Sequence, residues 1–367
     1  MNDISELYFL PAKHGDAFFL HCIKDNEEGW IIVDGGPSGN ARHNPFVNEV
    51  EKLPSHDLIV MTHQDDDHLM GIRAYIKTHM NDERFPVKRL WVNCARHMDF
   101  PKGGDLSPKH ASNMADLLAE IAKGNELIWT DRIVEGYHDD TIKFADIDIL
   151  NPAADMLDRF IPVYGEKAGV AEEKGTNLTV QTVQRCADDY AISMEELAKR
   201  EKEEPTEANY SQFANMVSIS FVVRCKGLSV LMLGDSFPAQ IVGALEHRGY
   251  SKDNKLSVDF VKVAHHGSRN NISNELLDMI DCHHYLISTN GGAARSYHPD
   301  REAMANIICH EGRDAGKIHL HFNYKLAEIE ASKHFKLFHK EEPEKYNFVI
   351  HEPGENAEGC QYRIAFD

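Results

Sequence analysis

A run of four apolar residues, 58–61, leads directly into the polar stretch THQDDDHLMG at residues 62–71. Apolar residues then recur with helical spacing, at positions 69, 70, 72, 75 and 76. The pattern predicts a buried strand, a short polar loop and a helix, in that order. Three acids and two histidines therefore share one strand-to-helix loop, either as a solvated turn or as a set of metal ligands.

The rest of the chain is predicted to combine short strands with helices. Runs at 6–10, 16–23 and 30–36 are separated by Gly-containing turns and predict an antiparallel meander. Helices are predicted at 112–124 and 300–310. Further strands are predicted by later apolar runs, at 87–93, 145–152, 216–225, 228–236, 258–268, 282–292, 317–323, 346–352 and 360–367. The runs at 216–225 and 228–236 flank the turn KG and predict a hairpin.

Two segments depart from this pattern. Residues 153–210 are polar, charged and helix-prone, which predicts an inserted helical cap or lid. Residues 326–367 end in β-like runs, and we expect them to form a β-rich C-terminal extension. A length of 367 residues with 42% hydrophobic content is enough to bury a large core, as one elaborated α/β domain or as two domains.

The composition limits the partners and the compartment. A formal net charge of -20 opposes nonspecific attraction to polyanions, because proteins that hold nucleic acid through many phosphates normally present a basic surface. The seven cysteines are scattered and never spaced as C-x-x-C, so neither a disulfide framework nor a thiolate zinc site is indicated. The sequence has no apolar run of membrane-spanning length and no secretory pattern at its start, so we expect a cytoplasmic protein without a membrane partner.

The acids and histidines of the loop are spaced as metal ligands. His63, Asp65, Asp67 and His68 form the pattern H-x-D-x-D-H. Alternate residues of an extended loop point together, and His68 turns with the start of the helix toward a second ion. Asp66 is predicted to point away and to tolerate substitution. The loop alone cannot complete two coordination spheres, so further ligands are expected at the ends of other strands.

Two later strands end in such side chains. Asp235 follows the apolar run LSVLML and a glycine, where a carboxylate packs poorly but is well suited to bridge two ions. The strand VDFVKVA is followed by His265 and His266 and then by Gly267 and Ser268, which suits an imidazole ligand beside a backbone cradle for phosphate. Each feature alone is common in ordinary turns. Their joint occurrence at three strand ends favours a metal site over a solvated loop.

With these residues the chain resembles the metallo-β-lactamase superfamily, and within it the hydrolase domain of DNA-internalisation competence proteins and its free-standing relatives. The matching motifs, in order, are HGDAFFL with IIVDGG, THQDDDHLMG, NMVSISFVV leading to LMLGDS, VAHHGS, and ISTNGGAARSYHP. The resemblance spans roughly residues 6–325 and leaves 153–210 and the last forty residues unmatched.

The resemblance implies an α/β (α+β) fold, namely a four-layer αββα sandwich over residues 1–367 as one domain, with a helical insertion and a two-metal site at one sheet edge. The implied ligands are His63 and Asp65 for one ion, Asp67, His68 and His265 for the other, and Asp235 as the bridge. Asp65 replaces the histidine of the common superfamily loop, and Asn215 stands where another histidine is expected. One coordination sphere is therefore richer in oxygen, which widens the expected ions from zinc to manganese.

The other motif residues are expected to act around the ions. Asp34 matches a position whose side chain orients the metal ligands without binding the ions itself. The predicted catalytic groups are Asp67, His266 and His298, and the predicted substrate-binding groups are Ser268 and Arg269.

Two ligand assignments stay open at this point. Spacing does not decide which of His265 and His266 is the ligand, and the other one would face substrate or donate a proton. His97, which follows the strand at 87–93, is an alternative to Asn215 as the ligand that completes the first sphere.

These features predict a metal-dependent hydrolase, and the motifs favour phosphodiester cleavage by a two-metal-bridged hydroxide. The expected substrate is a nucleic acid or a small nucleotide or phosphoester. A second reading is acyl hydrolysis of a lactone, thioester or β-lactam, because fold and site skeleton do not fix the substrate. A third reading is a non-catalytic module with a weakened site at Asn215, which binds an effector or a protein partner through 153–210.

Overall fold

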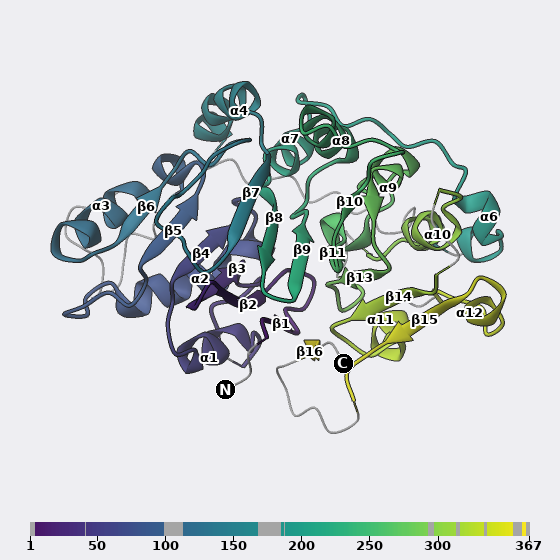
Figure 1. Ribbon diagram of the computed structural model, residues 1–367, viewed down its shortest axis with the longest axis horizontal. Coiled ribbons are helices and arrows are strands. Elements are labelled where there is room, and N and C mark those ends of the chain that lie inside the picture. The colour runs from purple at the N-terminus through teal and green to yellow at the C-terminus, as the bar shows by residue number, and fades with distance from the viewer. Residues whose placement is uncertain are drawn as a thin grey trace.

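Two seven-stranded sheets pack face to face, and helices cover both outer faces, so that the layers run helix, sheet, sheet, helix (Figure 1). In Figure 1 the N-terminal half, purple to blue, forms one side and the C-terminal half, green to yellow, the other. The predicted αββα architecture is confirmed. The computed structural model describes residues 4–40, 42–98, 113–167, 185–186, 188–292, 297–312, 316–333, 336–354 and 362–364.

The first sheet has the strand order β16-β1-β2-β3-β4-β5-β6. Strands β1 to β3 pair antiparallel, as the predicted meander requires, and β3 to β6 pair parallel. The bounds are β1 Glu6–Phe9, β2 Phe18–Lys24, β3 Glu27–Val33, β4 Leu58–Met61, β5 Arg89–Val92, β6 Ile128–Thr130 and β16 Tyr362–Ile364.

The second sheet has the order β15-β14-β13-β11-β9-β8-β7. The predicted hairpin is present as the antiparallel pair β8 and β9, and β9 to β15 pair parallel. The bounds are β7 Asp146–Asn151, β8 Ser220–Cys225, β9 Leu228–Met232, β11 Phe260–Lys262, β13 His284–Ile287, β14 Ile318–Phe322 and β15 Phe348–His351; β10 Leu256–Ser257 and β12 Ile280–Asp281 form a separate parallel pair.

Alternation along the strands builds three cores. In β2, Phe18 and Leu20 pack between the sheets, whereas Phe19 faces the outer helices. In β8, Phe221 likewise faces the first sheet and Val222 faces the helices on the other side. Because successive side chains of a strand point to opposite faces, such apolar runs bury both faces of each sheet.

The outer helices are short and amphipathic. Those on the first sheet are α1 Phe46–Glu49, α2 Asp66–His79 and α3 Met114–Gly124, and those on the second are α8 Pro238–His247, α9 Asn274–Asp278 and α10 Arg301–Cys309. In α2, Leu69, Ile72 and Ile76 recur at helical spacing and are buried against the sheet. No helix in the described ranges is both long enough and apolar enough to cross a membrane.

The described part of residues 153–210 is helical and packs onto the sandwich. It holds α4 Ala154–Lys167, α6 Met194–Leu197 and the start of α7 Tyr210–Met216. Phe160 of α4 packs on Phe213 of α7, and Leu197 of α6 joins the core beside α10. Residues 168–184 and 187 of this segment lie outside the described ranges.

The C-terminal segment after residue 325 adds one strand to each sheet, and it also contains two helices that the sequence did not predict. Strand β15 pairs with β14, and β16 pairs with β1. The helices are α11 Leu326–Lys333 and α12 Glu342–Lys345. Residues 355–361 and 365–367 lie outside the described ranges.

The carboxyl ends of the parallel strands meet where the two sheets adjoin. The Ile219 amide donates to the Thr62 carbonyl at 2.7 Å across the sheets, and the Gly35 amide, after β3, donates to the His68 carbonyl at 2.6 Å. A Cβ atom on Gly71 would lie 1.9 Å from the Gly35 carbonyl oxygen, so only glycine allows α2 to approach the end of β3 this closely.

Candidate metal centre

Four histidines surround one buried aspartate at the ends of β4, β9 and β11. Asp235 follows β9, and its side chain is 3% exposed. The Nε2 atoms of the four imidazoles lie at these distances from its carboxylate: His68 3.4 Å, His265 3.7 Å, His63 3.8 Å and His266 3.9 Å. These separations are long for hydrogen bonds but suit donors that share a metal ion, since each donor then lies about 2.0–2.2 Å from the ion.

Each of these rings is held through its other nitrogen, Nδ1. The Nδ1 partners and distances are the Asp34 carboxylate for His68 at 2.8 Å, the Ser288 carbonyl for His266 at 2.9 Å, the Thr62 hydroxyl for His63 at 3.1 Å and the Asn271 amide oxygen for His265 at 3.2 Å. Because acceptors occupy Nδ1–H, the lone pair of each neutral ring lies on Nε2 and faces the centre.

Asp34 supports two of the ligands at once. It accepts the Thr62 amide at 2.8 Å and the Thr62 hydroxyl at 2.7 Å, and it also accepts His68 Nδ1–H. The Thr62 hydroxyl in turn accepts from His63. A single buried carboxylate therefore fixes the orientation of both histidines of the loop.

The three acids of the loop separate as the sequence indicated. Asp65 is the residue at the N-cap position of α2, where its side chain makes no capping hydrogen bond, and its carboxyl group lies 3.7 Å from His63 Nε2. Asp67 lies 3.5 Å from His266 Nε2 and 4.0 Å from His68 Nε2. Asp66 is exposed, as expected for the acid that points away.

Two further charged residues, which the sequence analysis did not single out, complete the cluster. Asp16 and Lys262 are both buried and form an ion pair. Asp16 also lies 3.3 Å from His266 Nδ1, and Lys262 donates to the Gly234 carbonyl at 2.9 Å. The signals for them were the aspartate of HGDAFFL and a lysine inside the otherwise apolar strand VDFVKVA.

The cluster holds more negative than positive charge. Although burial opposes a charge on His68, Asp235 and Asp34 raise its pKa well above the usual range. Burial likewise opposes a charge on His266, but Asp16 and Asp235 raise its pKa to about 9. Burial and the carboxylate of Asp67 raise the pKa of Asp65 to about 8. Histidines stabilised as cations beside an acid stabilised as neutral indicate a site that takes up positive charge.

The buried polar atoms fit the same conclusion. Several have no hydrogen-bond partner among the described residues: Nε2 of His63, His68 and His266, and Oδ1 of Asp16, Asn215 and Asp235. Three groups in this cluster have ligand atoms close enough to hold an ion: His63 with His68 and Asp235, Asp67 with His68 and His266, and Asp16 with Asp34 and His68. Mixed imidazole and carboxylate donors are those that divalent zinc or manganese accepts.

A cavity of about 190 Å³ opens beside the centre. It is lined by His14, Asp67, His265, His266, Thr289, Gly292 and His298. His298 Nδ1 lies 3.3 Å from the Asp300 carboxylate, and the His298 and His265 rings are 5.1 Å apart. The cavity therefore places four histidines beside Asp67 at the entrance to the cluster.

The comparisons with known proteins give a fold likeness and nothing closer. No family model matches this chain, and no curated protein sequence matches it. Among similar solved structures is a variant of CmlA β-hydroxylase, with a TM-score of 0.38 and 12% identity, covering 100% of this chain and 54% of that one. Another is CmlA, a diiron β-hydroxylase from Streptomyces venezuelae, with a TM-score of 0.38 and 12% identity, covering 84% and 51%. This chain spans about half the length of those chains.

The two adjacent histidines differ in their surroundings. His266 is the one that lies near Asp67 and His68, whereas the resemblance implies His265 in that group and spacing leaves the choice between the two open. His265 lies instead between Asp235 and Asn215, whose Nδ2 is 3.4 Å from His265 Nδ1. The φ angles of His265 and His266 are 48° and 56°, a left-handed conformation that costs about 1 kcal/mol or more per residue and that the surrounding contacts must enforce.

Neither of the predicted substrate-binding residues, Ser268 and Arg269, lines the cavity beside the centre. Arg269 donates to Glu203 at 2.9 Å and does not line the cavity beside the centre. Ser268 is buried, and its amide donates to the His265 carbonyl at 2.9 Å. His97 lies in the short helix η2 Ala95–His97, and its side chain lies outside the described part of the structure.

Proposed function

We propose that the protein is a metal-dependent phosphodiester hydrolase of the metallo-β-lactamase superfamily, with a two-metal centre around Asp235. The observation that carries the proposal is the arrangement of four imidazole Nε2 atoms, 3.4 to 3.9 Å from one buried carboxylate, with Nδ1 of each ring held by the protein. The order of the motifs along the chain supports it independently.

The donor groups divide into two sets that share Asp235. His63 and Asp65, with Asn215 and His265 beside them, would hold one ion, and Asp67, His68 and His266 the other. Ions held there would supply a water with a pKa near 7 and offset negative charge on a phosphoryl group. Zinc and manganese both accept this mixture of nitrogen and oxygen donors.

The residues around the cavity would bind and orient the substrate. His298 lines the cavity, with Nδ1 3.3 Å from the Asp300 carboxylate, and a proton carried on its Nε2 could pass to a leaving oxygen. Burial lowers the pKa of His14, which also lines the cavity, and the neutral ring that this favours can donate one hydrogen bond to a phosphoryl oxygen.

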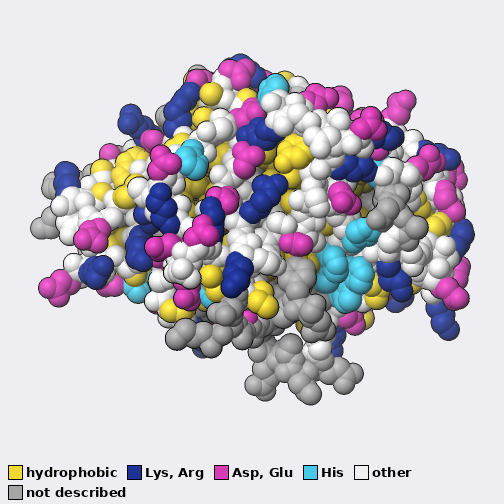
Figure 2. Space-filling view, viewed as in Figure 1, with side chains coloured by type: hydrophobic (Ala, Val, Ile, Leu, Met, Phe, Trp, Pro, Cys, Tyr) yellow, Lys and Arg dark blue, Asp and Glu magenta, His cyan; other side chains and the backbone are white. Residues whose placement is uncertain are grey.

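The cavity size and the overall charge bear on the substrate class. About 190 Å³ accommodates a phosphodiester group with little of its substituents. The formal charge of -20 disfavours contact with a long polyanion. Acidic and basic side chains are interspersed on the face seen in Figure 2, without a continuous basic track. A small phosphodiester or nucleotide, or the end of a nucleic-acid strand, fits these conditions best.

The test is a substrate panel run on the full chain reconstituted with Zn²⁺ or Mn²⁺. The panel contains bis-p-nitrophenyl phosphate, cyclic nucleotides, single- and double-stranded DNA, RNA, a lactone and a thioester. We expect phosphodiester turnover, and a loss of about 10²-fold or more in Asp67→Ala and in Asp235→Ala, because each removes charge stabilisation at the reacting group.

The matched control is His138→Gln, since His138 is exposed and pairs only with Asp140 among the described residues. It should retain full activity. Turnover that survives Asp235→Ala would identify a contaminant, and turnover of the lactone or thioester alone would replace the phosphodiester proposal with acyl hydrolysis.

A further inference from the structure

Four more histidines lie together on the second sheet, away from the centre around Asp235. His284 begins β13, His319 and His321 lie in β14, and His351 ends β15. In the parallel register His284 is opposite His319, and His321 is opposite His351. Residues opposite one another or two apart share a face, so all four rings lie on the same face of three neighbouring strands. We call this group the histidine ladder.

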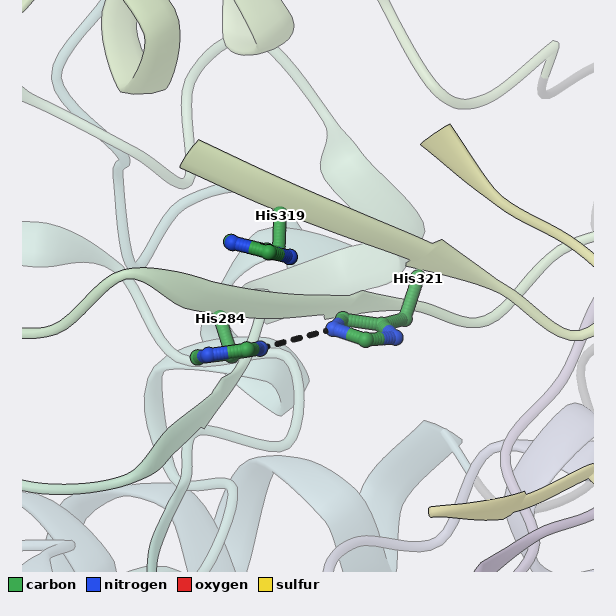
Figure 3. Close-up of side chains that lie close together, drawn as sticks. All are labelled: His284, His319 and His321. Atoms are coloured by element: carbon green, nitrogen blue, oxygen red, sulfur yellow. Dashed lines mark hydrogen bonds between the residues drawn. The ribbon is translucent and has the colours of Figure 1, made fainter. Parts of the chain in front are cut away.

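The rings of the ladder are close enough to act together. His284 Nδ1 is 3.0 Å from His321 Nε2, and His319 Nδ1 is 2.8 Å from His351 Nε2. The ring centroids of His284 and His319 are 4.3 Å apart, and those of His321 and His351 are 4.4 Å apart. Figure 3 shows the rings of His284, His319 and His321 beside one another, with the bond between His284 and His321 dashed.

The nitrogen separations match those of ligands on one ion. One ligand atom each from His284, His319 and His321 can be chosen so that all three lie within 4.8 Å of one another. Two nitrogens that bind a tetrahedral ion at about 2.0–2.1 Å lie about 3.3 Å apart. The 3.0 Å pair is therefore already at ligand spacing, and a small rotation of His319 would add the third donor.

The rings are also in a suitable state to bind. His321 is 4% exposed and the others are partly exposed, so the ladder can be reached from solvent. Histidine side chains are visible together at the surface in Figure 2, in the region where Figure 1 places β13 and β14. Burial and the neighbouring imidazoles lower the pKa of His284 to about 4, so that its ring is neutral and offers a lone pair at pH 7.

We propose that the histidine ladder is a second metal site, which binds one divalent transition ion through His284, His319 and His321, with His351 beside them. The donors are imidazoles alone, a set that zinc, copper and nickel accept and that manganese and magnesium, which prefer oxygen, do not. The proposed site differs from the centre around Asp235 because its ligand set contains no oxygen donors. It does not depend on the proposed hydrolase activity.

The first test measures zinc bound by the full chain. Protein stripped with a chelator is loaded with Zn²⁺, passed through gel filtration and analysed for metal. We expect the double variant His284→Gln/His319→Gln to bind one equivalent fewer than the wild type and than the His138→Gln control. A double variant with native circular dichroism and the wild-type zinc content would overturn the proposal.

A second test does not require a variant. Wild-type crystals soaked in Zn²⁺ are measured at wavelengths on either side of the zinc absorption edge. We expect an anomalous peak between His284, His319 and His321, in addition to density near Asp235. A peak near Asp235 without one at the ladder would reject the second site. Crystals soaked in Mn²⁺ should show a peak near Asp235 only, and manganese at the ladder would contradict the argument from donor type.

Discussion

The centre around Asp235 and the histidine ladder each gather four imidazoles, but their neighbours differ. At the centre the imidazoles lie among five carboxyl groups, those of Asp16, Asp34, Asp65, Asp67 and Asp235, together with the ammonium group of Lys262. In the ladder the rings hydrogen-bond to one another, through His284 with His321 and His319 with His351. Histidine number alone therefore does not decide what a site binds, whereas the oxygen donors around the histidines do.

The two groups also lie on different parts of the sheets. The candidate ligands of the centre follow the carboxyl ends of β4, β9 and β11, in loops and in the first turn of α2. Those of the ladder lie within β13, β14 and β15 and are spaced by the sheet itself. Loops can direct side chains from several directions around an ion, whereas a strand face presents them in a row.

The buried ion pair at the centre has no counterpart in the ladder, and its loss should have the largest effect on stability. Lys262→Met would leave Asp16 buried without its cation, so the free energy of unfolding should fall by about 3 kcal/mol. His284→Gln removes one hydrogen bond and should lower it by about 1 kcal/mol. Urea denaturation of both variants gives the comparison.

Adding Asp16→Asn to Lys262→Met should restore part of the lost stability, because the buried negative charge is then removed as well. Equal losses in Lys262→Met and His284→Gln would show that the charge pair at the centre has no special importance for stability.

The carboxylate behind the loop histidines gives the next largest effect. Asp34→Asn weakens the acceptor for His68 Nδ1–H and for Thr62, so the affinity of the centre for Zn²⁺ should fall by about 10- to 100-fold. Zinc bound at the ladder should not change. Competition with a chromophoric chelator measures both classes of site, and a parallel loss at the two would contradict their independence.

The response to pH should distinguish the ladder in chelator-treated protein. Burial and the other imidazoles lower the pKa of His321 to about 2 and that of His284 to about 4, while an unfolded histidine titrates near about 6.5. The unfolded chain thus binds more protons below pH 6.5. The contribution of the neutral rings to the free energy of unfolding is therefore fully present above pH 6.5, and it is lost as the pH falls toward 4.

The carboxyl group of Asp235 responds in a more acidic range than the ladder, because the neighbouring histidines outweigh burial and lower its pKa. Its contribution is present above the unfolded value of about 3.9 and is lost only in more acidic solution. His284→Gln should therefore lose less stability than the wild type between pH 7 and pH 4.5, as measured by urea denaturation. An identical loss in the two proteins would exclude the ladder as a source of the pH dependence.

The smallest effect is expected at Asp66. Its side chain is exposed, so Asp66→Asn should change the free energy of unfolding by less than about 0.5 kcal/mol and leave zinc binding unchanged. Asp67→Asn, one residue along, should lose zinc affinity at the centre. A defect of similar size in both variants would mean that the loop directs a different acid toward the metals.

Much of the fold could be predicted because strand signals are local. The apolar alternation of β2 and β8 indicated two buried faces, and the Gly-containing turns indicated the meander and the hairpin. The candidate ligands could also be predicted, because His63, Asp235 and His265 each follow an apolar strand. The carboxyl ends of strands in such sheets tend to meet.

The remaining features depend on which strands become neighbours. In the sequence, Lys262 looks like a lysine on an exposed edge strand. Only the folded structure shows that Asp16, just before β2, lies beside it. The choice between His265 and His266 depends on two positive φ angles that spacing does not predict. The pair H-L-H in β14 indicated two histidines on one face, but only the order β15-β14-β13 brings His284 and His351 beside them.

Strands β15 and β16, each the outermost strand at one end of its own sheet, are the last of the described strands in the chain. During synthesis from the N-terminus, β1 and β14 would therefore leave the ribosome with unpaired edges, which are prone to associate with other chains until their partners arrive. The same delay applies to His351, so the ladder can be completed only after β15 has been synthesised and has paired with β14.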